Sequence, residues 1–434
     1  MNLQRCDYPA VGEAVYAAEL DNGLRVYVMP KRGYNKKYAT FATHYGSVDS
    51  HFQAPGDPEP VNVPDGIAHF LEHKLFEKKE GNVFDQFAAL GAMSNAFTTY
   101  TSTSYLCSTT ENFPQCLDLL VDFVLRPYFT DESVAKEKGI IAQEIRMYED
   151  SPRWRLRDNL LMALYHDYPV RVNIAGTVES IANITKELLY KCYRTFYRPE
   201  NMNLFVTGEV DPAWVIDRIA ARGPASGGPR GEIKRLFPPE PATVNRPLVD
   251  EAMAVAVPLI LVGFKDQDVG YDGPGLLDKA VYMDVLLEAL LGRGSPIYDS
   301  LYRDGLIDER FAFDYDGERD YGYAAIGGES RDPELLLDRL ATAFDEVRRT
   351  GLEPDTFERV RRKLTGGFIA GFNSPDYAAH NFTLYRFRDV DIFDYLTALG
   401  QATLEGANQR LRAFFDPSAM AASVVRPGGI SGRA

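Results

Sequence analysis

Two histidines and a glutamate near the start of the chain have the types and the spacing of a metal site. The segment His69-Phe70-Leu71-Glu72-His73 lies in an apolar stretch, 66–76, that predicts a helix. His69 and His73 are four residues apart, so on a helix both imidazoles leave one face, where they can hold a single zinc ion. Glu72 lies on the same side and can act as a base toward a metal-activated water. These parts predict a metallopeptidase centre, in the inverted order relative to His-Glu-x-x-His.

The alternative interpretation of this segment is a pair of satisfied core histidines. A five-residue pattern occurs by chance, and a histidine on an apolar helix face usually has no metal. The chain holds only 6 histidines among 434 residues, so two of them at ligand spacing around a glutamate favour a metal site.

A third protein ligand is needed, because a catalytic zinc keeps only one of its positions for water. Residues 131–148 predict a helix, with a buried stripe made by Ile140, Ile141, Ile145 and Met147. Glu137 and Glu144 are seven residues apart, two helical turns, so they share one face of that helix. Either carboxylate could reach the metal, although acidic helix residues are more often simply solvated.

The stretches 66–77, 95–98 and 137–148 together resemble the pitrilysin/insulysin (M16) family of zinc peptidases. Within it the chain is most similar to the bacterial processing-peptidase branch, in particular its YmfH-like members. The resemblance runs over nearly the whole chain and is densest over 65–212. It implies one zinc ion (Zn2+) per chain.

The resemblance also assigns roles to these residues. It implies that His69, His73 and Glu144 hold the zinc and that Glu72 is the catalytic base. It also implies that Glu137 supports the zinc ligands without binding the metal itself. The third ligand of the family stands in an Ile-x-x-Glu context, which here is Ile141 to Glu144. The spacing from His73 to Glu144 is a few residues shorter than in the best-known members, which we interpret as a loop deletion.

Substrate binding is implied in the same way by Asn95-Ala96-Phe97-Thr98, which resembles the family's substrate edge strand. Asn95, Ala96 and Phe97 would pair with an extended peptide through the backbone. The family also uses an Arg-x6-Tyr pair in its non-metal half, and there this chain departs from the pattern. Leu301 and Asp308 stand at the two positions. We therefore expect a heterodimer whose homologous partner supplies the pair, with a homodimer as the alternative.

The expected fold class is α+β, with two similar domains that each pack helices on an antiparallel-rich sheet and that face each other across a cavity. Strands are predicted at 15–20, 24–29 and 38–45, and a hairpin at 94–98 and 105–109. A weaker repeat follows, in which Val285, Ala289, Val360 and Gly367 replace the metal-site residues. We predict a metal-binding domain at 1–223, a Gly/Pro-rich linker at 224–247 and a non-metal domain at 248–434.

The composition is that of a globular enzyme. The net charge of -15 argues against binding nucleic acid or an anionic membrane. No apolar run is long enough for a membrane span, and no signal peptide is recognised. The 4 cysteines lack Cys-x-x-Cys spacing, which favours buried free thiols in a cytoplasmic protein.

The function predicted from these features is a zinc-dependent endopeptidase subunit that hydrolyses peptides or unfolded segments. A non-catalytic scaffold or assembly subunit is the first alternative, although such relatives usually lose the His/Glu set. A dedicated maturation peptidase for one modified peptide is the second, and the sequence does not separate it from general peptide turnover.

Overall fold

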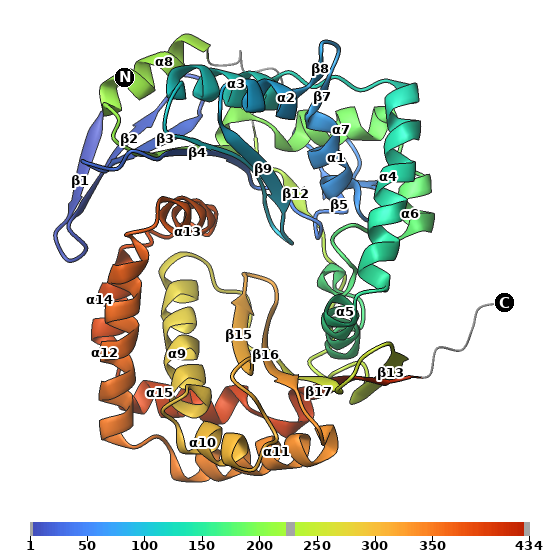
Figure 1. The fold of residues 1–434 in the computed structure, drawn as a ribbon, viewed down its shortest axis with the longest axis vertical. Coiled ribbons are helices and arrows are strands. Elements are labelled where there is room, and N and C mark those ends of the chain that lie inside the picture. Colours follow the sequence, from blue (N-terminus) through green and yellow to red (C-terminus); the bar gives the residue numbers. More distant parts are fainter. Residues whose placement is uncertain (1–2, 223–230, 429–434) are drawn as a thin grey trace. The chain divides into compact units, whose positions relative to one another are not determined.

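A computed structural model describes residues 3–222 and 231–428 of the chain (Figure 1). The chain forms two compact units, and each is assembled from separate segments. Unit 1 comprises Met1–Ile145, Asn173–Phe237 and Ile369–Phe387, and unit 2 comprises Arg146–Val172, Pro238–Phe368 and Arg388–Ala434. The contiguous domain limits given above remain a prediction, and residues 224–230 of the proposed linker lie outside the described residues.

Unit 1 is built on a seven-stranded sheet. In spatial order its strands are β1 (Gln4–Tyr8), β2 (Glu13–Glu19), β3 (Arg25–Pro30), β11 (Met202–Gly208), β4 (Lys37–Thr43), β10 (Thr103–Thr109) and β9 (Met93–Thr98). The pair of β3 and β11 is parallel, and all other neighbours are antiparallel. The sheet therefore has two free edges, β1 at one side and β9 at the other.

Unit 2 repeats the five neighbouring strands of this sheet that run from β3 to the edge strand β9. Its five strands are β13 (Leu248–Met253), β17 (Met420–Pro427), β14 (Leu259–Lys265), β16 (Gly322–Glu329) and β15 (Ala312–Gly317). The order and the strand directions match those of β3, β11, β4, β10 and β9, including one parallel pair at the same place. The expected fold class of two similar mixed α/β domains is confirmed.

The helices follow the same repeat. Those of the first half are α1 (Ile67–Leu75), α2 (Val83–Ala89), α3 (Phe113–Leu125), α4 (Asp131–Glu149), α5 (Pro152–Leu164), α6 (Val178–Ala182), α7 (Lys186–Phe196) and α8 (Pro212–Arg222). Those of the second half are α9 (Gly273–Leu291), α10 (Pro296–Arg303), α11 (Pro333–Thr350), α12 (Pro354–Gly371), α13 (Pro375–Phe387), α14 (Asp394–Gln401) and α15 (Leu404–Phe414). The short strands are β5 (His51–Gln53), β6 (Val61–Asn62), β7 (Glu77–Lys78), β8 (Gly81–Asn82) and β12 (Lys234–Arg235).

Two helices belong to the unit opposite to the one that their place in the sequence suggests. Helix α13, from the second half, packs on β4 and β11 of unit 1, where Phe382 meets Tyr27 and Phe205 at ring distances of 4.9 and 4.7 Å. Helix α5, from the first half, packs on β14 and β17 of unit 2, with Leu160 against Gly263. Each sheet thus buries one apolar face under a helix supplied by the other half of the chain.

One local expectation, the buried stripe of α4, differs from the structure. Ile141 and Ile145 of α4 are buried as expected, but Ile140 and Met147 are 45% and 58% exposed, so the buried stripe is narrower than predicted. The sequence spacing of Ile140 and Met147 is compatible with either the buried or the exposed side of α4. Only the packing of the helix decides which side they occupy.

The segments that the structure describes contain no helix long and apolar enough to cross a membrane. The four cysteines are free thiols; Cys107, Cys116 and Cys192 are buried, whereas Cys6 is only half-buried.

Gly66 sets the start of the metal-site helix through its backbone. It is the N-cap of α1 at φ 86°, a left-handed conformation that favours glycine. A Cβ there would lie 2.3 Å from the carbonyl oxygen of Ala175. Helix α1 can therefore approach the loop before α6 only because this position has no side chain.

We expect Gly66→Ala to lower the stability of the full chain by about 3 kcal/mol or more, because backbone strain and a backbone clash add together. The matched control is Gly33→Ala, which has φ 79° and no heavy atom near the added Cβ. That change should cost only the strain, about 1 kcal/mol. Thermal unfolding of both variants measures the difference, and equal losses would contradict the role given to the Ala175 contact.

Candidate metal centre

Helix α1 presents the two histidines to one place, as their spacing requires. His69 and His73 lie one turn apart with their ring centroids 4.5 Å from each other. The rest of the helix is anchored by apolar side chains, since Ile67, Phe70 and Leu71 are almost fully buried. The apolar residues around the two histidines thus fix the helix on the sheet side and leave the imidazoles to face α4.

Helix α4 brings Glu144 to both imidazoles. One carboxylate oxygen lies 3.7 Å from Nε2 of His69, and the other lies 3.4 Å from Nε2 of His73. Neighbouring ligand atoms of a tetrahedral zinc site are separated by about 3.4 Å, given metal bonds of about 2.1 Å. Within the described residues, this trio is the one group of three or more His, Cys, Asp or Glu side chains arranged to hold a metal. Its donor types and spacing fit zinc with one position left open.

The two histidines have opposite pKa shifts. Burial, with a smaller contribution from His73, lowers the pKa of His69 to about 4 although Glu144 and Glu137 oppose the shift. Burial lowers the pKa of His73 too, but its hydrogen bond to Glu137 and the charges of Glu72 and Glu144 outweigh burial, so that the net shift is upward. His69 is therefore neutral near pH 7 and has a lone pair ready for a cation. The raised pKa of His73 means that a metal competes with a proton for this imidazole more strongly than at an ordinary histidine.

Glu72 lies beside the trio without being part of it. Its carboxylate accepts a 2.6 Å hydrogen bond at Oε2 from the hydroxyl of Thr98 on β9. Burial raises the pKa of Glu72 to about 7, with the Thr98 hydrogen bond and His73 acting against the rise. The carboxylate thus has one oxygen held in place and the other available, at a basicity suited to proton transfer near neutral pH.

Glu137 lies on the far side of His73 from the candidate metal position. Its Oε1 is 3.1 Å from Nδ1 of His73, so the imidazole N–H donates to Glu137 and Nε2 is left as the acceptor toward the trio. Glu137 is in turn 3.9 Å from the ammonium of Lys74, a side chain with no exposed surface. Lys74 was missed from the sequence, although a lysine in an apolar helix run directly after His73 was a usable signal.

Strand β9 carries the three residues predicted to bind substrate. β9 is the last strand of the sheet, so no strand among residues 3–222 and 231–428 pairs with its outer edge. The backbone N–H of Ala96 donates to the side-chain oxygen of Asn95 at 3.0 Å. Phe97 is half-buried and contacts His380 in a tilted arrangement at a ring-centroid distance of 5.3 Å. Strand β9 thus contacts Glu72 through Thr98, and its outer edge begins to be available at Asn95.

Unit 2 has the corresponding helix without the chemistry. On α9, Val285 and Ala289 are buried apolar residues. The stretch at the end of α10 also lacks the Arg/Tyr pair: Leu301 is buried, and Asp308 binds the guanidinium of Arg310. Arg303, the nearest arginine, is an exposed side chain paired with Asp299 at 2.6 Å.

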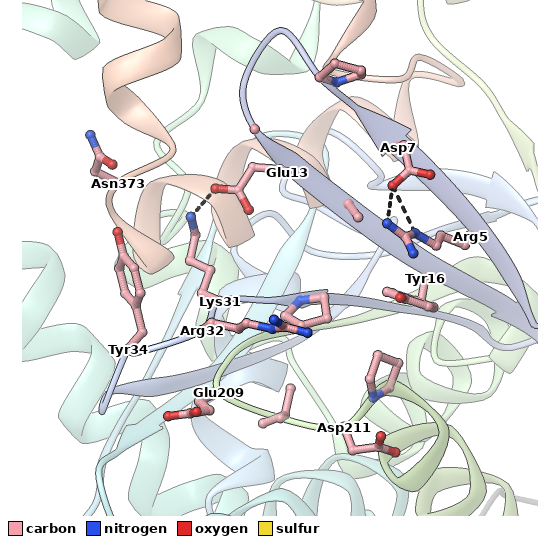
Figure 2. Close-up of a pocket in the computed structure, with 16 residues that line it drawn as sticks. Arg5, Asp7, Glu13, Tyr16, Lys31, Arg32, Tyr34, Glu209, Asp211 and Asn373 are labelled. Atoms are coloured by element: carbon pink, nitrogen blue, oxygen red, sulfur yellow. Dashed lines mark hydrogen bonds and ion pairs between the residues drawn. The ribbon is translucent and has the colours of Figure 1, made fainter.

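A separate polar groove of about 1000 Å³ lies in unit 1 beside β1 and β2 (Figure 2). The carboxylate of Glu13 pairs with Lys31, and that of Asp7 pairs with Arg5, as the dashed lines in Figure 2 show. No histidine or cysteine lines this groove. It lies at the sheet edge opposite to β9, so it is not part of the candidate metal centre.

A helix with two histidines facing a glutamate of a second helix, beside the edge strand of a mixed sheet, is the arrangement of a zinc-peptidase class of protein. Comparison with known proteins agrees. Residues 59–178 match the family described as Insulinase (Peptidase family M16), and residues 183–364 match the Peptidase M16 inactive domain.

Individual relatives make the assignment specific. The chain is 47% identical over 406 residues to the zinc protease YmfH of Bacillus subtilis (strain 168), covering 93% of this chain and 94% of that protein. It is 24% identical over 382 residues to the Bacillus subtilis zinc protease YmxG, covering 84% and 89% of the two chains. An M16-like peptidase from Alicyclobacillus acidocaldarius has a crystal structure with a TM-score of 0.92 and 38% identity, covering 99% of both chains. The chain belongs to peptidase family M16.

The buried Glu72 should destabilise the metal-free protein at high pH. Its pKa is raised when folded, so the folded state binds its proton more firmly and stability falls as the pH rises from about 4.5 to about 7. Glu72→Gln cannot ionise. We expect the metal-free variant to be more stable than wild type at pH 8, by up to about 3 kcal/mol, with the difference shrinking toward pH 5.

Thermal melts in the presence of a chelator at both pH values measure this difference. The matched control is Glu80→Gln, the same change at an exposed position of the same segment, which should show little effect at either pH. A metal-free wild type that is more stable than Glu72→Gln at pH 8 would contradict the assignment of a raised pKa to Glu72.

Proposed function

We propose that this chain is a zinc-dependent endopeptidase subunit that hydrolyses peptides or unfolded segments. The observation that carries the proposal is Glu144 within 3.7 Å of one imidazole and 3.4 Å of the other, with the buried carboxylate of Glu72 beside them. The arrangement combines the ligand set of a catalytic zinc with a base that is not itself a ligand.

In this proposal His69, His73 and Glu144 hold the ion. A zinc ion bound there would activate water and polarise the scissile carbonyl. Glu72 accepts the proton from the attacking water at the oxygen that Thr98 leaves free, and then returns it to the departing amine nitrogen. Glu137 keeps His73 in the tautomer whose Nε2 faces the ion.

The substrate would bind as an extra strand along the outer edge of β9. An extended peptide can take the place of the Asn95 side chain on the N–H of Ala96, and the freed amide of Asn95 can then hydrogen-bond the peptide. Backbone pairing of this kind gives affinity with little demand on the peptide's sequence. Phe97 would contact a substrate side chain next to the cleaved bond.

The partner proposal rests on Leu301 and Asp308. Neither residue can donate hydrogen bonds to a substrate carbonyl as an Arg/Tyr pair would: Leu301 is apolar and buried, and Asp308 is an acceptor engaged by Arg310. We infer that a homologous subunit supplies those donors in a heterodimer. A homodimer is the alternative assembly, but it would not add the donors, because its second copy carries the same Leu301 and Asp308.

Cleavage of a mixed peptide library, read by mass spectrometry, tests the proposed reaction. Zinc-loaded wild type should cleave, and Glu72→Gln should lose about 10³-fold in rate, because a positioned general base contributes about 10²- to 10⁴-fold. Glu80→Gln is the matched control and should retain activity. No cleavage by wild type in any mixture, with zinc bound, would favour a scaffold subunit or a single-substrate maturation peptidase.

The divided site is tested by the same assay with and without a co-encoded homologue. We expect specific activity to rise on mixing and to fall on dilution as the complex dissociates. Strong activity of this chain alone, undiminished by dilution, would show that the partner is not needed.

A further inference from the structure

Lys74 is a charged group buried directly behind the candidate metal centre. It follows His73 on α1, so its side chain leaves the helix about 100° away from the imidazoles and points into the protein. The side chain has no exposed surface. Burying an ammonium group is costly unless it is paired, so its partners indicate why it is tolerated.

Three groups surround the ammonium. The Glu77 carboxylate forms a short ion pair with it, and the carbonyl oxygen of Ser133 lies 3.4 Å away in the first turn of α4. The third is Oε2 of Glu137 at 3.9 Å, an ion pair without a hydrogen bond. Glu77 is partly exposed, with 35% of its side chain accessible, whereas Glu137 is buried, so the charge interaction with Glu137 is the less screened of the two.

The two carboxylate oxygens of Glu137 therefore face different neighbours, His73 and Lys74. Its Oε1 accepts the N–H of His73, and its Oε2 faces Lys74. The charge attraction of Lys74 on Oε2 favours the carboxylate orientation in which Oε1 accepts from His73, and that hydrogen bond in turn orients the ring of His73. Nε2 of that ring then points to the place where Glu144 lies 3.4 Å away.

We propose that Lys74 is a positioning residue for the metal centre, which acts through Glu137 to hold His73 in its ligating orientation. This inference rests on the proposed zinc site. It differs from a purely structural role, in which Lys74 would only tie α1 to α4. It also differs from direct electrostatics, in which a nearby cation would repel the metal and weaken its binding.

Zinc affinity of the full chain, measured by competition with a chelator, separates these roles. Loss of an outer hydrogen-bond partner of a ligand typically weakens metal binding by about 10- to 100-fold. We expect that range for Glu137→Gln and a loss of about tenfold for Lys74→Met, with recovery in Lys74→Arg. In the double variant Lys74→Met/Glu137→Gln the affinity should match that of Glu137→Gln alone, because the two residues act in series.

The matched control is Lys31→Met, which removes another buried, ion-paired lysine of unit 1 near the opposite sheet edge. It should leave zinc affinity unchanged even where it lowers the melting temperature. Lys74→Gln keeps a hydrogen-bond donor and removes only the charge, so it replaces Lys74→Met in the cycle if the latter does not fold.

Each outcome has one meaning. Lys74 variants that bind zinc as tightly as wild type, or more tightly, would overturn the inference, and so would additive losses in the double variant. A wild-type chain that binds no zinc would instead refute the proposed function on which the inference rests.

Discussion

Crowding of acidic side chains around two imidazoles is the constraint on which the site depends. Glu72, Glu137 and Glu144 all lie within reach of His73, and Glu72 and Glu137 are almost fully buried. Like charges at such distances raise each other's free energy in a medium of low dielectric. A divalent cation bound as proposed between His69, His73 and Glu144 would balance these charges.

The fold supplies the rigidity that this crowding needs. Helix α1 is fixed by buried apolar residues and by Gly66, whose bare backbone lets the helix start against the loop at Ala175. Helix α4 contributes Glu137 and Glu144 from positions two turns apart on one face. The edge strand β9 meets the same place through Thr98, so ligands, base and substrate edge converge from three separate elements of unit 1.

The position of His69 and His73 on one face of a helix could be predicted from the sequence, because helical periodicity alone requires it. Helical spacing does not choose between Glu137 and Glu144, since both lie on one face of α4. The family resemblance favours Glu144 as the ligand, and in the structure Glu144 is the residue that lies near both Nε2 atoms. The repeat of the sheet was predictable from matching strand and helix patterns. The exchange of α5 and α13 between the two units was not predictable, because the apolar face of an amphipathic helix does not indicate which sheet it will cover. The role of Lys74 was not predictable for a similar reason, because its partners are brought together only by the fold.

X-ray absorption spectroscopy of the zinc-loaded chain tests the central claim most directly, because it reports the atoms bound to the ion. The account predicts two imidazole nitrogens together with oxygen ligands at about 2.0–2.2 Å and no sulfur. The same spectrum from the Glu144→Gln variant should show a changed or lost oxygen shell while any remaining zinc keeps its imidazoles. Sulfur at about 2.3 Å, or a shell without imidazole, would contradict it.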